Sequence, residues 1–600
     1  MSTRTVPQRK DIPAAHQWDL TPLFDSDAQW ETLFDQVTSD LEGYAAYRGR
    51  LGESPALLRE AIAYDLDVSL NLSRLYTFAH LRSDEDKANT RALGFYQRAA
   101  SLYTRAAECS SFYRPELMAI PAPRMAAFLD SADLAPYRFH LETILRYAPH
   151  TLTGTEEALL AKSGEMSQAA AQVFGQLDNV DLQFGTITTA DGSQSELSHG
   201  NFITFLMDPD RDIRKCAFRQ YYAQYDAHRH TLAAALAASA KKDVFYARAR
   251  NYTDCRSAAL FPDNMPSSVY DNLVTTVREN RAPLFDYLAL RRKALNLEAL
   301  HIYDTYVPLV ADVDFIMPFE EAVDVCVQAL APLGTVYGDT LRQGLLGGWV
   351  DRYENRGKRS GAYSSGCYGS PPYILMNYED HAINSLYTLI HEAGHSMHTY
   401  LSNQAQPHVY HGYAIFVAEV ASTLNETLLS HYLLDRHAND PRMRAYILNR
   451  EIDNIRATLY RQTMFAEFEQ RVHAAAESDQ PLTVDTFQNI YRELLETYFG
   501  AHLILDPELT LECFRIPHFY TAFYVYKYAT GISAAISLAR GILEGGSKKT
   551  DEYLEFLSLG GSRYPLDALA VAGVDMTSPQ PITAAIAHFS LRLAQLTETL

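Results

Sequence analysis

The chain has 600 residues, of which 47% are apolar and 21% charged, so it can bury a large core and shows no sign of wholesale disorder. Its 73 acidic residues outnumber its 52 basic residues, which gives a net charge of −21. This acidic balance argues against an extended nucleic-acid interface, because such an interface requires clustered lysine and arginine to neutralise phosphates.

Cysteines and the N-terminus set further limits. The six cysteines are widely scattered and form no C-x-x-C pair, so neither a disulfide framework nor a thiolate zinc site is expected. The N-terminus has no apolar stretch behind its basic residues, and no later run reaches the roughly 20 apolar residues that span a bilayer. We therefore expect a soluble, cytoplasmic protein.

The first third of the chain has mainly helical patterns. From about residue 18 to 180 the apolar residues recur at helical spacing, as they do at Val68, Leu72, Leu75, Tyr76 and Ala79. Residues 178–192 differ. They combine β-branched residues with Gly185 and the pair Asp191-Gly192, which predicts a short hairpin.

Helical patterns resume after this segment and continue almost to the C-terminus, with two interruptions. A start signal at Asp208-Pro209-Asp210 precedes the next helices, and residues 261–266 break them. A glycine-rich stretch from 347 to 377 is irregular, although residues 373–376 have strand composition. We expect a mainly α fold with a small β element just before residue 380.

A run that combines two histidines with a glutamate follows this β element: His391-Glu392-Ala393-Gly394-His395. On a helix at about 100° per residue the histidines lie opposite a continuous apolar stripe, which comprises Leu386, Ile390, Ala393, Met397 and Leu401. Histidines four residues apart lie one turn apart, so both imidazoles can reach one metal ion. Glu392 projects beside that ion, where it can accept a proton from water.

The bare H-E-x-x-H pattern also arises by chance in a chain with 20 histidines, on buried helices whose histidines are only hydrogen-bonded. The consistent histidine face and the continuous apolar stripe favour the metal site. Gly394 lowers helix propensity by roughly 1 kcal/mol relative to alanine. We therefore expect this glycine to serve packing or access.

A catalytic zinc ion needs a third protein ligand and an open fourth position. The next helical pattern, at 413–434, is strongly apolar but carries Glu419 and Glu426 on a polar stripe. Lone buried carboxylates are costly, so this stripe must face water, a partner or a metal, and a simple exposed face is the alternative. We predict Glu419 as the third ligand and Glu426 as the carboxylate that orients a ligand imidazole. His398 competes for this region, and we assign it only a supporting or rim role.

Further segments share a pattern with a known family, in order along nearly the whole chain. They are WDL at 18–20, GWVD at 348–351, NRGKRSGAYS at 355–364, HEAGHSMH at 391–398, FVAEVAS at 416–422, LGGS at 559–562 and AGVDMTSP at 572–579. Through these segments the chain resembles the oligoendopeptidase F family, within the larger group of thimet-oligopeptidase-like zinc peptidases.

The resemblance implies a fold and a division of the chain. It implies a mainly α, elongated multi-helix peptidase of the zincin type, with a deep substrate channel and a small β element beside the zinc helix. Such a channel admits unstructured peptides, which would contact Ala362, Tyr363 and Tyr373 and could pair as an added strand. We assign residues 1–200 to an N-terminal helical region that forms the channel wall or lid, and residues 201–600 to the catalytic domain.

Family members also place a histidine and several tyrosines from a late segment over the zinc. The corresponding segment here is PHFYTAFYVYKY at 517–528, although the family spaces its histidine further from the first tyrosine. On a helix Tyr520 and Tyr524 share a face, whereas in an extended chain Tyr524, Tyr526 and Tyr528 do. We favour His518, Tyr520 and Tyr524, and the identity of the donor tyrosine stays open.

The implied reaction is hydrolysis of internal bonds in short oligopeptides, with one zinc ion per chain. Zinc polarises the peptide carbonyl and lowers the pKa of a water molecule. Glu392 then acts as the general base, and His518 and a tyrosine donate to the oxyanion. Partners are oligopeptide substrates, with no nucleic acid and no membrane, and the chain acts as a monomer or small homo-oligomer.

Two alternatives remain. A metallocarboxypeptidase on a similar fold would need a cation to hold the terminal carboxylate of its substrate, such as Lys358, Arg359 or Lys527. A non-catalytic peptide-binding protein would keep the channel, but the intact Glu392 argues against it, since a pure binder needs no base.

Overall fold

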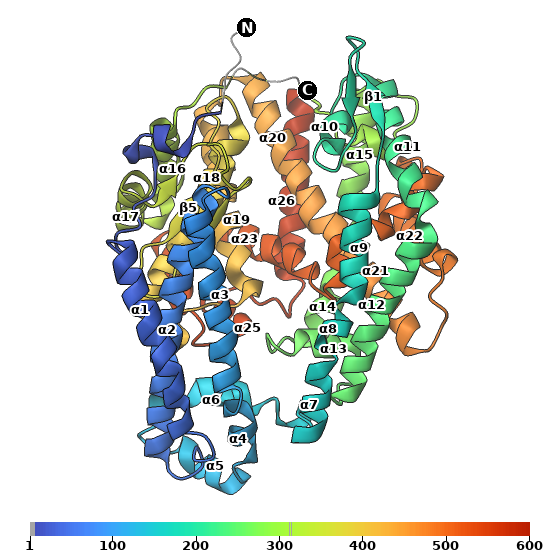
Figure 1. Ribbon diagram of the computed structural model, residues 1–600. Coiled ribbons are helices and arrows are strands. Elements are labelled where there is room, and N and C mark those ends of the chain that lie inside the picture. The colour runs from blue at the N-terminus through green and yellow to red at the C-terminus, as the bar shows by residue number, and fades with distance from the viewer. Residues whose placement is uncertain (1–5, 311–312, 314) are drawn as a thin grey trace. The chain divides into compact units, whose positions relative to one another are not determined.

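The computed structural model describes residues 6–310, 313 and 315–600, and most of them lie in helices (Figure 1). The predicted mainly α class is therefore confirmed. The chain divides into two compact units: the first comprises Met1–Pro149, Asp314–Tyr432 and Leu538–Gly573, and the second comprises His150–Val313, Leu433–Ser537 and Val574–Leu600. The predicted division near residue 200 concerned function and stays a prediction.

The first unit contains the histidine motif, long helices and one small sheet. Its helices are α1 (Asp27–Asp40), α2 (Pro55–Glu85), α3 (Thr90–Ser110), α4 (Tyr113–Ala119), α5 (Ala122–Leu129), α6 (Arg138–Leu145), α16 (Phe319–Ala329), α17 (Thr335–Leu346), α18 (Ile383–Ala405), α19 (Ile415–Arg436, whose last residues belong to the second unit), α24 (Ser547–Ser558) and α25 (Pro565–Val571).

The second unit is also helical. Its helices are α7 (Gly154–Lys162), α8 (Gly164–Ser167), α9 (Ala169–Gln176), α10 (Phe202–Leu206), α11 (Arg211–Ala227), α12 (Arg229–Ala249), α13 (Cys255–Leu260), α14 (Ser267–Glu279), α15 (Ala282–Ala294), α20 (Pro441–Ile455), α21 (Gln462–Glu477), α22 (Val484–Phe499), α23 (Tyr526–Gly545, which begins here) and α26 (Gln580–Thr599). No helix in the described part of the chain combines the length and apolar character needed to cross a bilayer.

The longest helix, α2, confirms the apolar face that the sequence predicts. Val68, Leu72, Leu75 and Ala79 are buried on this face. Trp30 of α1 is fully buried and its indole nitrogen donates to the carbonyl of Leu75 at 3.0 Å. This core continues from α1, α2 and α3 to the side chains of the sheet, so the helices and the sheet form one packed body.

The sheet of the first unit has three short strands in the order β3-β5-β4. β3 (Val350–Asp351) runs parallel to β5 (Tyr373–Leu375), and β4 (Tyr363–Ser365) pairs with β5 antiparallel, with Ser364 opposite Ile374. The central strand β5 is fully buried, which explains its continuous apolar sequence. The predicted strand at 373–376 is thus confirmed, and β4 forms one edge beside α18.

Buried charges hold the loop that precedes β4. The ammonium group of Lys358, which has no exposed surface, lies 2.6 Å from the Asp351 carboxylate and donates to the main-chain carbonyls of Tyr353 and Met376. Arg9 contacts the same carboxylate at 2.5 Å. Each charge lies beside a group of opposite charge, which reduces the cost of keeping charges inside a protein.

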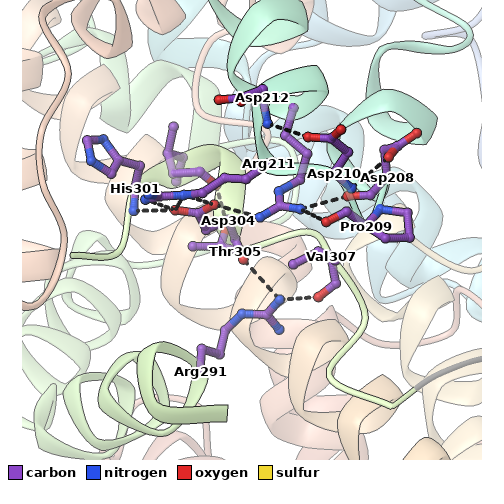
Figure 2. A network of polar contacts seen from close by, with 12 residues as sticks. Asp208, Pro209, Asp210, Arg211, Asp212, Arg291, His301, Asp304, Thr305 and Val307 are labelled. Carbon is purple, nitrogen blue, oxygen red and sulfur yellow. Dashed lines mark hydrogen bonds and ion pairs between the residues drawn. The ribbon is translucent and has the colours of Figure 1, made fainter. Parts of the chain in front are cut away.

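A second buried ion group anchors the loop before residue 310 in the second unit (Figure 2). The carboxylate of Asp304 has no exposed surface and accepts hydrogen bonds from Arg211 at 2.8 Å and Arg214 at 2.9 Å, both from α11. Arg291 of α15 donates to the carbonyl oxygens of Asp304 and Val307. The loop is thereby tied to two helices at once.

The structure corrects the predicted hairpin at 178–192. Residues Leu177–Asp181 form a π-helical turn that continues α9, and the hairpin comes later, from β1 (Thr186–Thr188) to β2 (Gln194–Glu196). Its turn contains Gly192 at φ 82°, a conformation that glycine adopts without strain. The turn signal Asp191-Gly192 was therefore right, but it lies in the middle of the hairpin rather than at its end.

Candidate metal centre

The two helices that carry the predicted ligands cross at a point where only glycine fits. A Cβ atom on Gly394 of α18 would lie 2.6 Å from the Cα atom of Ser422 and 2.7 Å from the carbonyl oxygen of Ala421, both on α19. The side-chain amide of Asn425 donates to the carbonyl of Ile390 at 3.2 Å and links the helices further. The packing role expected for Gly394 is thus explained by this close approach.

At this crossing His391, His395 and Glu419 bring their ligand atoms together. The three atoms lie within 4.8 Å of one another, and this is the one such group of three found among the described residues. The Glu419 carboxylate lies 3.5 Å from Nε2 of His391 and 3.7 Å from Nε2 of His395. Two imidazoles and one carboxylate form a donor set that suits a catalytic zinc ion, because it leaves a fourth position for water or substrate.

Glu426 contacts the first histidine of the group from the side away from Glu419. Its carboxylate lies 2.7 Å from Nδ1 of His391, the ring nitrogen that does not face Glu419. Burial lowers the pKa of His391, but the hydrogen bond and charge of Glu426, with smaller contributions from Glu392 and Glu419, raise it to about 9. By contrast, burial and the neighbouring charge of His391 lower the pKa of His395 to about 4. Carboxylate partners of this kind fix the orientation of a ligand imidazole.

Glu392 lies beside the group and contributes no ligand atom to it. It is 7% exposed, and burial, together with the negative charge of Glu419, raises the pKa of its carboxyl group to about 7, although His391 and the N–H of Ser364 act in the opposite direction. A carboxyl group with a pKa near neutrality can both accept and return a proton. Ser364 belongs to the edge strand β4, and its hydroxyl contacts that of Ser396 on α18 at 2.8 Å.

His398 lies apart from the ligand atoms. Its ring stacks on Tyr413 with centroids 3.6 Å apart and planes 4° apart, and it is 1% exposed. Burial, followed by the nearby charge of His395, lowers the pKa of His398 to about 3, so the ring is neutral. Its contacts are those of a packing residue behind the group of ligand atoms.

The three predicted substrate-binding residues differ in their burial and in their side-chain contacts. Ala362 is half-buried just before β4. The hydroxyl of Tyr363 donates to Asp84 of α2 at 2.7 Å, and its neighbour Ser365 contacts His80 of the same helix at 3.0 Å. Tyr373 is fully buried on β5 and packs edge-on against Trp18, so its side chain supports the strand from within the core.

In the second unit the late aromatic segment brings together a different set from the one predicted. The ring of His518 lies 6.0 Å from that of Tyr524 and 5.9 Å from that of Tyr528, and its Nε2 atom is 3.3 Å from the Tyr528 hydroxyl. Tyr520 instead stacks on Phe174 of α9, with centroids 4.5 Å apart. The sequence offered one signal for Tyr528, its helical spacing of four residues from Tyr524.

Fold and site together define a mainly helical metallopeptidase of the H-E-x-x-H type. The family model of peptidase family M3 matches residues 204–588, and that of oligopeptidase F matches residues 116–184. The chain therefore belongs to peptidase family M3, whose members are metallopeptidases, and it is an oligopeptide-cleaving enzyme of the oligoendopeptidase F type.

Known proteins support this assignment over the full length. The chain is 44% identical to oligopeptidase PepF of Bacillus subtilis over 596 residues, which cover 99% of this chain and 89% of that protein. A solved structure of a protein from Chlamydophila abortus has a TM-score of 0.92 and 37% identity, and covers 99% of this chain and 100% of its own. The structure of oligoendopeptidase F from Enterococcus faecium has a TM-score of 0.74 at 33% identity, and covers 96% and 99%.

Proposed function

We propose that this chain is a zinc-dependent endopeptidase that cuts internal bonds of short, unstructured peptides. The observation that carries the proposal is the group formed by His391, His395 and Glu419 with Glu392 buried beside it. A zinc ion bound there would supply Lewis-acid polarisation of the peptide carbonyl and a lowered pKa for the attacking water. Its cytoplasmic location and its state as a monomer or small homo-oligomer stay predictions.

The remaining steps of the proposed reaction are assigned to individual side chains. Glu392 takes a proton from the attacking water and delivers it to the leaving amine, a role that its near-neutral pKa supports. Glu426 holds the His391 ring through Nδ1, so that Nε2 faces the ligand position. We further propose that His518 and a neighbouring tyrosine donate hydrogen bonds to the oxyanion. Tyr524 and Tyr528 lie beside His518, which favours them over Tyr520.

Replacing Glu392 by Gln tests the base. The amide keeps the size of the side chain but cannot take a proton, so turnover should fall below detection while one zinc ion per chain remains bound. Glu320→Gln serves as a control, because Glu320 is a carboxylate that pairs with Arg352 away from the ligand group. Peptide cleavage by Glu392→Gln at the wild-type rate would reject the assignment.

The carboxypeptidase alternative needs an available cation, and the contacts of two of its three candidates disfavour it. Lys358 is fully buried on Asp351, and Lys527 pairs with Asp263 at 2.8 Å. Arg359 contacts Asp84 at 3.4 Å but is more than half exposed, so it is the remaining candidate. A peptide blocked at both ends separates the two activities, since an endopeptidase cuts it and an exopeptidase does not. Zinc content and peptide cleavage should be measured on the same sample. Cleavage by the zinc-loaded protein would reject a purely peptide-binding role.

A further inference from the structure

The turn that joins the predicted oxyanion segment to α23 has an unusual backbone. Phe523 adopts a φ of 56°, in the left-handed region that bulky residues rarely occupy. It lies between η13 (Pro517–Tyr520), which carries His518, and Tyr524. A residue in this conformation persists only where its surroundings hold it.

The surroundings of Phe523 include one buried carboxyl group. The main-chain N–H of Phe523 donates to Oε1 of Glu469 on α21 at 2.9 Å. Glu469 is 2% exposed, and its Oε2 atom has no hydrogen-bond partner within the described ranges of the chain. Burial, and to a lesser extent the charge of Asp243, raises the pKa of Glu469 well above its usual value. The Oε1 atom of Glu469 is the hydrogen-bond acceptor for the main chain of Phe523.

The side chain of Phe523 also packs against α21 and a residue bonded to it. Its ring is 3% exposed and packs on His473 of α21 with centroids 4.7 Å apart and on Tyr270 of α14 at 5.7 Å. Tyr270 in turn donates to the main-chain carbonyl of Ala466 on α21 at 2.6 Å. Both the backbone and the ring of Phe523 are thus anchored to α21.

This anchoring decides where the next side chain lies. Tyr524 follows the left-handed residue directly, and its ring lies 6.0 Å from His518 and 5.5 Å from Tyr528. The main-chain N–H of Lys527 returns to the carbonyl of Tyr524 at 3.1 Å, which closes the turn into α23. A change of φ at Phe523 would rotate this turn and separate Tyr524 from its two aromatic neighbours.

We infer that Glu469 is a positioning residue for catalysis: it fixes the left-handed turn at Phe523 and thereby holds Tyr524 beside His518 and Tyr528. This inference rests on the proposed function, in which His518 and a tyrosine donate to the oxyanion. Glu469 is buried and acts through the main chain of Phe523. Because only the acceptor oxygen matters, an amide at position 469 should serve as well as the acid.

Two substitutions of Glu469 test the inference in the full-length, zinc-loaded enzyme. Glu469→Leu removes the acceptor but fills the same space, and it also removes a buried, incompletely bonded acid, so folding should be preserved. Glu469→Gln keeps a carbonyl acceptor for Phe523. Glu467→Leu is the matched control, because Glu467 is also buried on α21 but bonds to Arg278 and Tyr498 instead.

Hydrogen exchange of the peptide that contains Phe523 reports the turn, and kcat with KM reports catalysis. In Glu469→Leu we expect faster exchange at residues 521–525 and a fall in kcat of up to about 100-fold, the scale of a small misplacement of a catalytic group, with KM little changed. Glu469→Gln should resemble the wild type in both measurements. Glu467→Leu should change neither, even where its thermal stability falls.

The outcomes separate the inference from the proposed function. Unchanged exchange at 521–525 in Glu469→Leu overturns the inference, and so does a Glu469→Gln variant as impaired as Glu469→Leu. Faster exchange with an unchanged kcat overturns the proposed catalytic use of His518 and its tyrosine, while the structural hold of Glu469 on the turn stands.

Discussion

Nδ1 of His391 lies 2.7 Å from the carboxylate of Glu426, while Nε2 of the same ring lies 3.5 Å from Glu419. The two ring nitrogens therefore face different carboxylates, Nδ1 that of Glu426 and Nε2 that of Glu419, the predicted ligand. Both carboxylates come from one helix, α19, one heptad apart. Rotation of the imidazole away from Glu419 would break the hydrogen bond between its Nδ1 atom and Glu426, so this rotation costs free energy.

Loss of this orienting contact should weaken metal binding. We expect Glu426→Ala to lower zinc affinity by about 10- to 100-fold, the usual range for the partner of a ligand histidine. Competition with a chromophoric chelator measures this affinity. Thr427→Ala is the control, because the hydroxyl of Thr427 donates to the carbonyl of Thr423 within α19. Equal zinc affinity in Glu426→Ala and the wild type would contradict the role given to Glu426.

A methyl group at Gly394 should force the two ligand-bearing helices apart. Its Cβ atom would lie 2.6 to 2.8 Å from backbone atoms of α19, which cannot move aside as a side chain can. We expect Gly394→Ala to lower the free energy of unfolding by about 1–3 kcal/mol, as overpacking does, and to reduce zinc content.

The matched control for this variant is Gly94→Ala in α3. Nothing lies within 4 Å of a Cβ atom at Gly94, so alanine there should raise stability by up to about 1 kcal/mol through helix propensity. Denaturant unfolding measures both effects. A Gly394→Ala protein as stable as Gly94→Ala would mean that the helix crossing tolerates a wider spacing.

The donor tyrosine can be identified by removing single hydroxyl groups. Loss of one oxyanion donor typically costs about 100- to 1,000-fold in kcat. We expect this fall for Tyr524→Phe or Tyr528→Phe, whose rings lie beside His518, and a nearly wild-type kcat for Tyr520→Phe, which stacks on Phe174. Steady-state kinetics on one oligopeptide measures all three. A large loss confined to Tyr520→Phe would instead identify Tyr520, one of the two tyrosines that the sequence favours, as the donor.

Removal of the carboxylate at the centre of the second buried ion group should destabilise the second unit (Figure 2). Asp304→Ala would leave Arg214, itself buried, without its carboxylate partner. We expect a loss of about 3–5 kcal/mol in unfolding free energy, the cost of an unpaired buried charge. Asp212→Ala, on the exposed first turn of α11, should cost far less. Thermal and denaturant unfolding of both variants compare them.

Stability should fall on mild acidification because of His411, which follows α18. Burial, and then the charge of His408, lowers the pKa of His411 to about 4, whereas an unfolded histidine titrates near 6.5. Between these values the unfolded chain binds the proton more readily, so this contribution is complete above about pH 6.5 and is lost as the pH falls toward 4. The melting temperature at pH 5.0 and 7.5 should differ less in His411→Asn than in the wild type.

The sequence alone determined the features that depend on neighbours along the chain. The spacing of His391 and His395 places both imidazoles on one helical face, and the polar stripe on the next apolar helix identified Glu419 and Glu426. The strand at 373–376 followed from local composition in the same way. The structure brings these side chains together and has the strand where it was predicted, because helical and strand periodicity are local properties, which a run of residues specifies without reference to its tertiary partners.

Only the tertiary structure decided contacts between distant segments. The close approach of α18 and α19 explains Gly394, the stacking of Tyr520 on Phe174 separates it from His518, and Glu469 reaches Phe523 from 54 residues away. Such contacts depend on how helices pack, and packing is set by the shape and burial of whole faces. The local pattern could therefore predict candidate ligands and a candidate base, whereas the turn that places Tyr524 beside His518 required the packed structure.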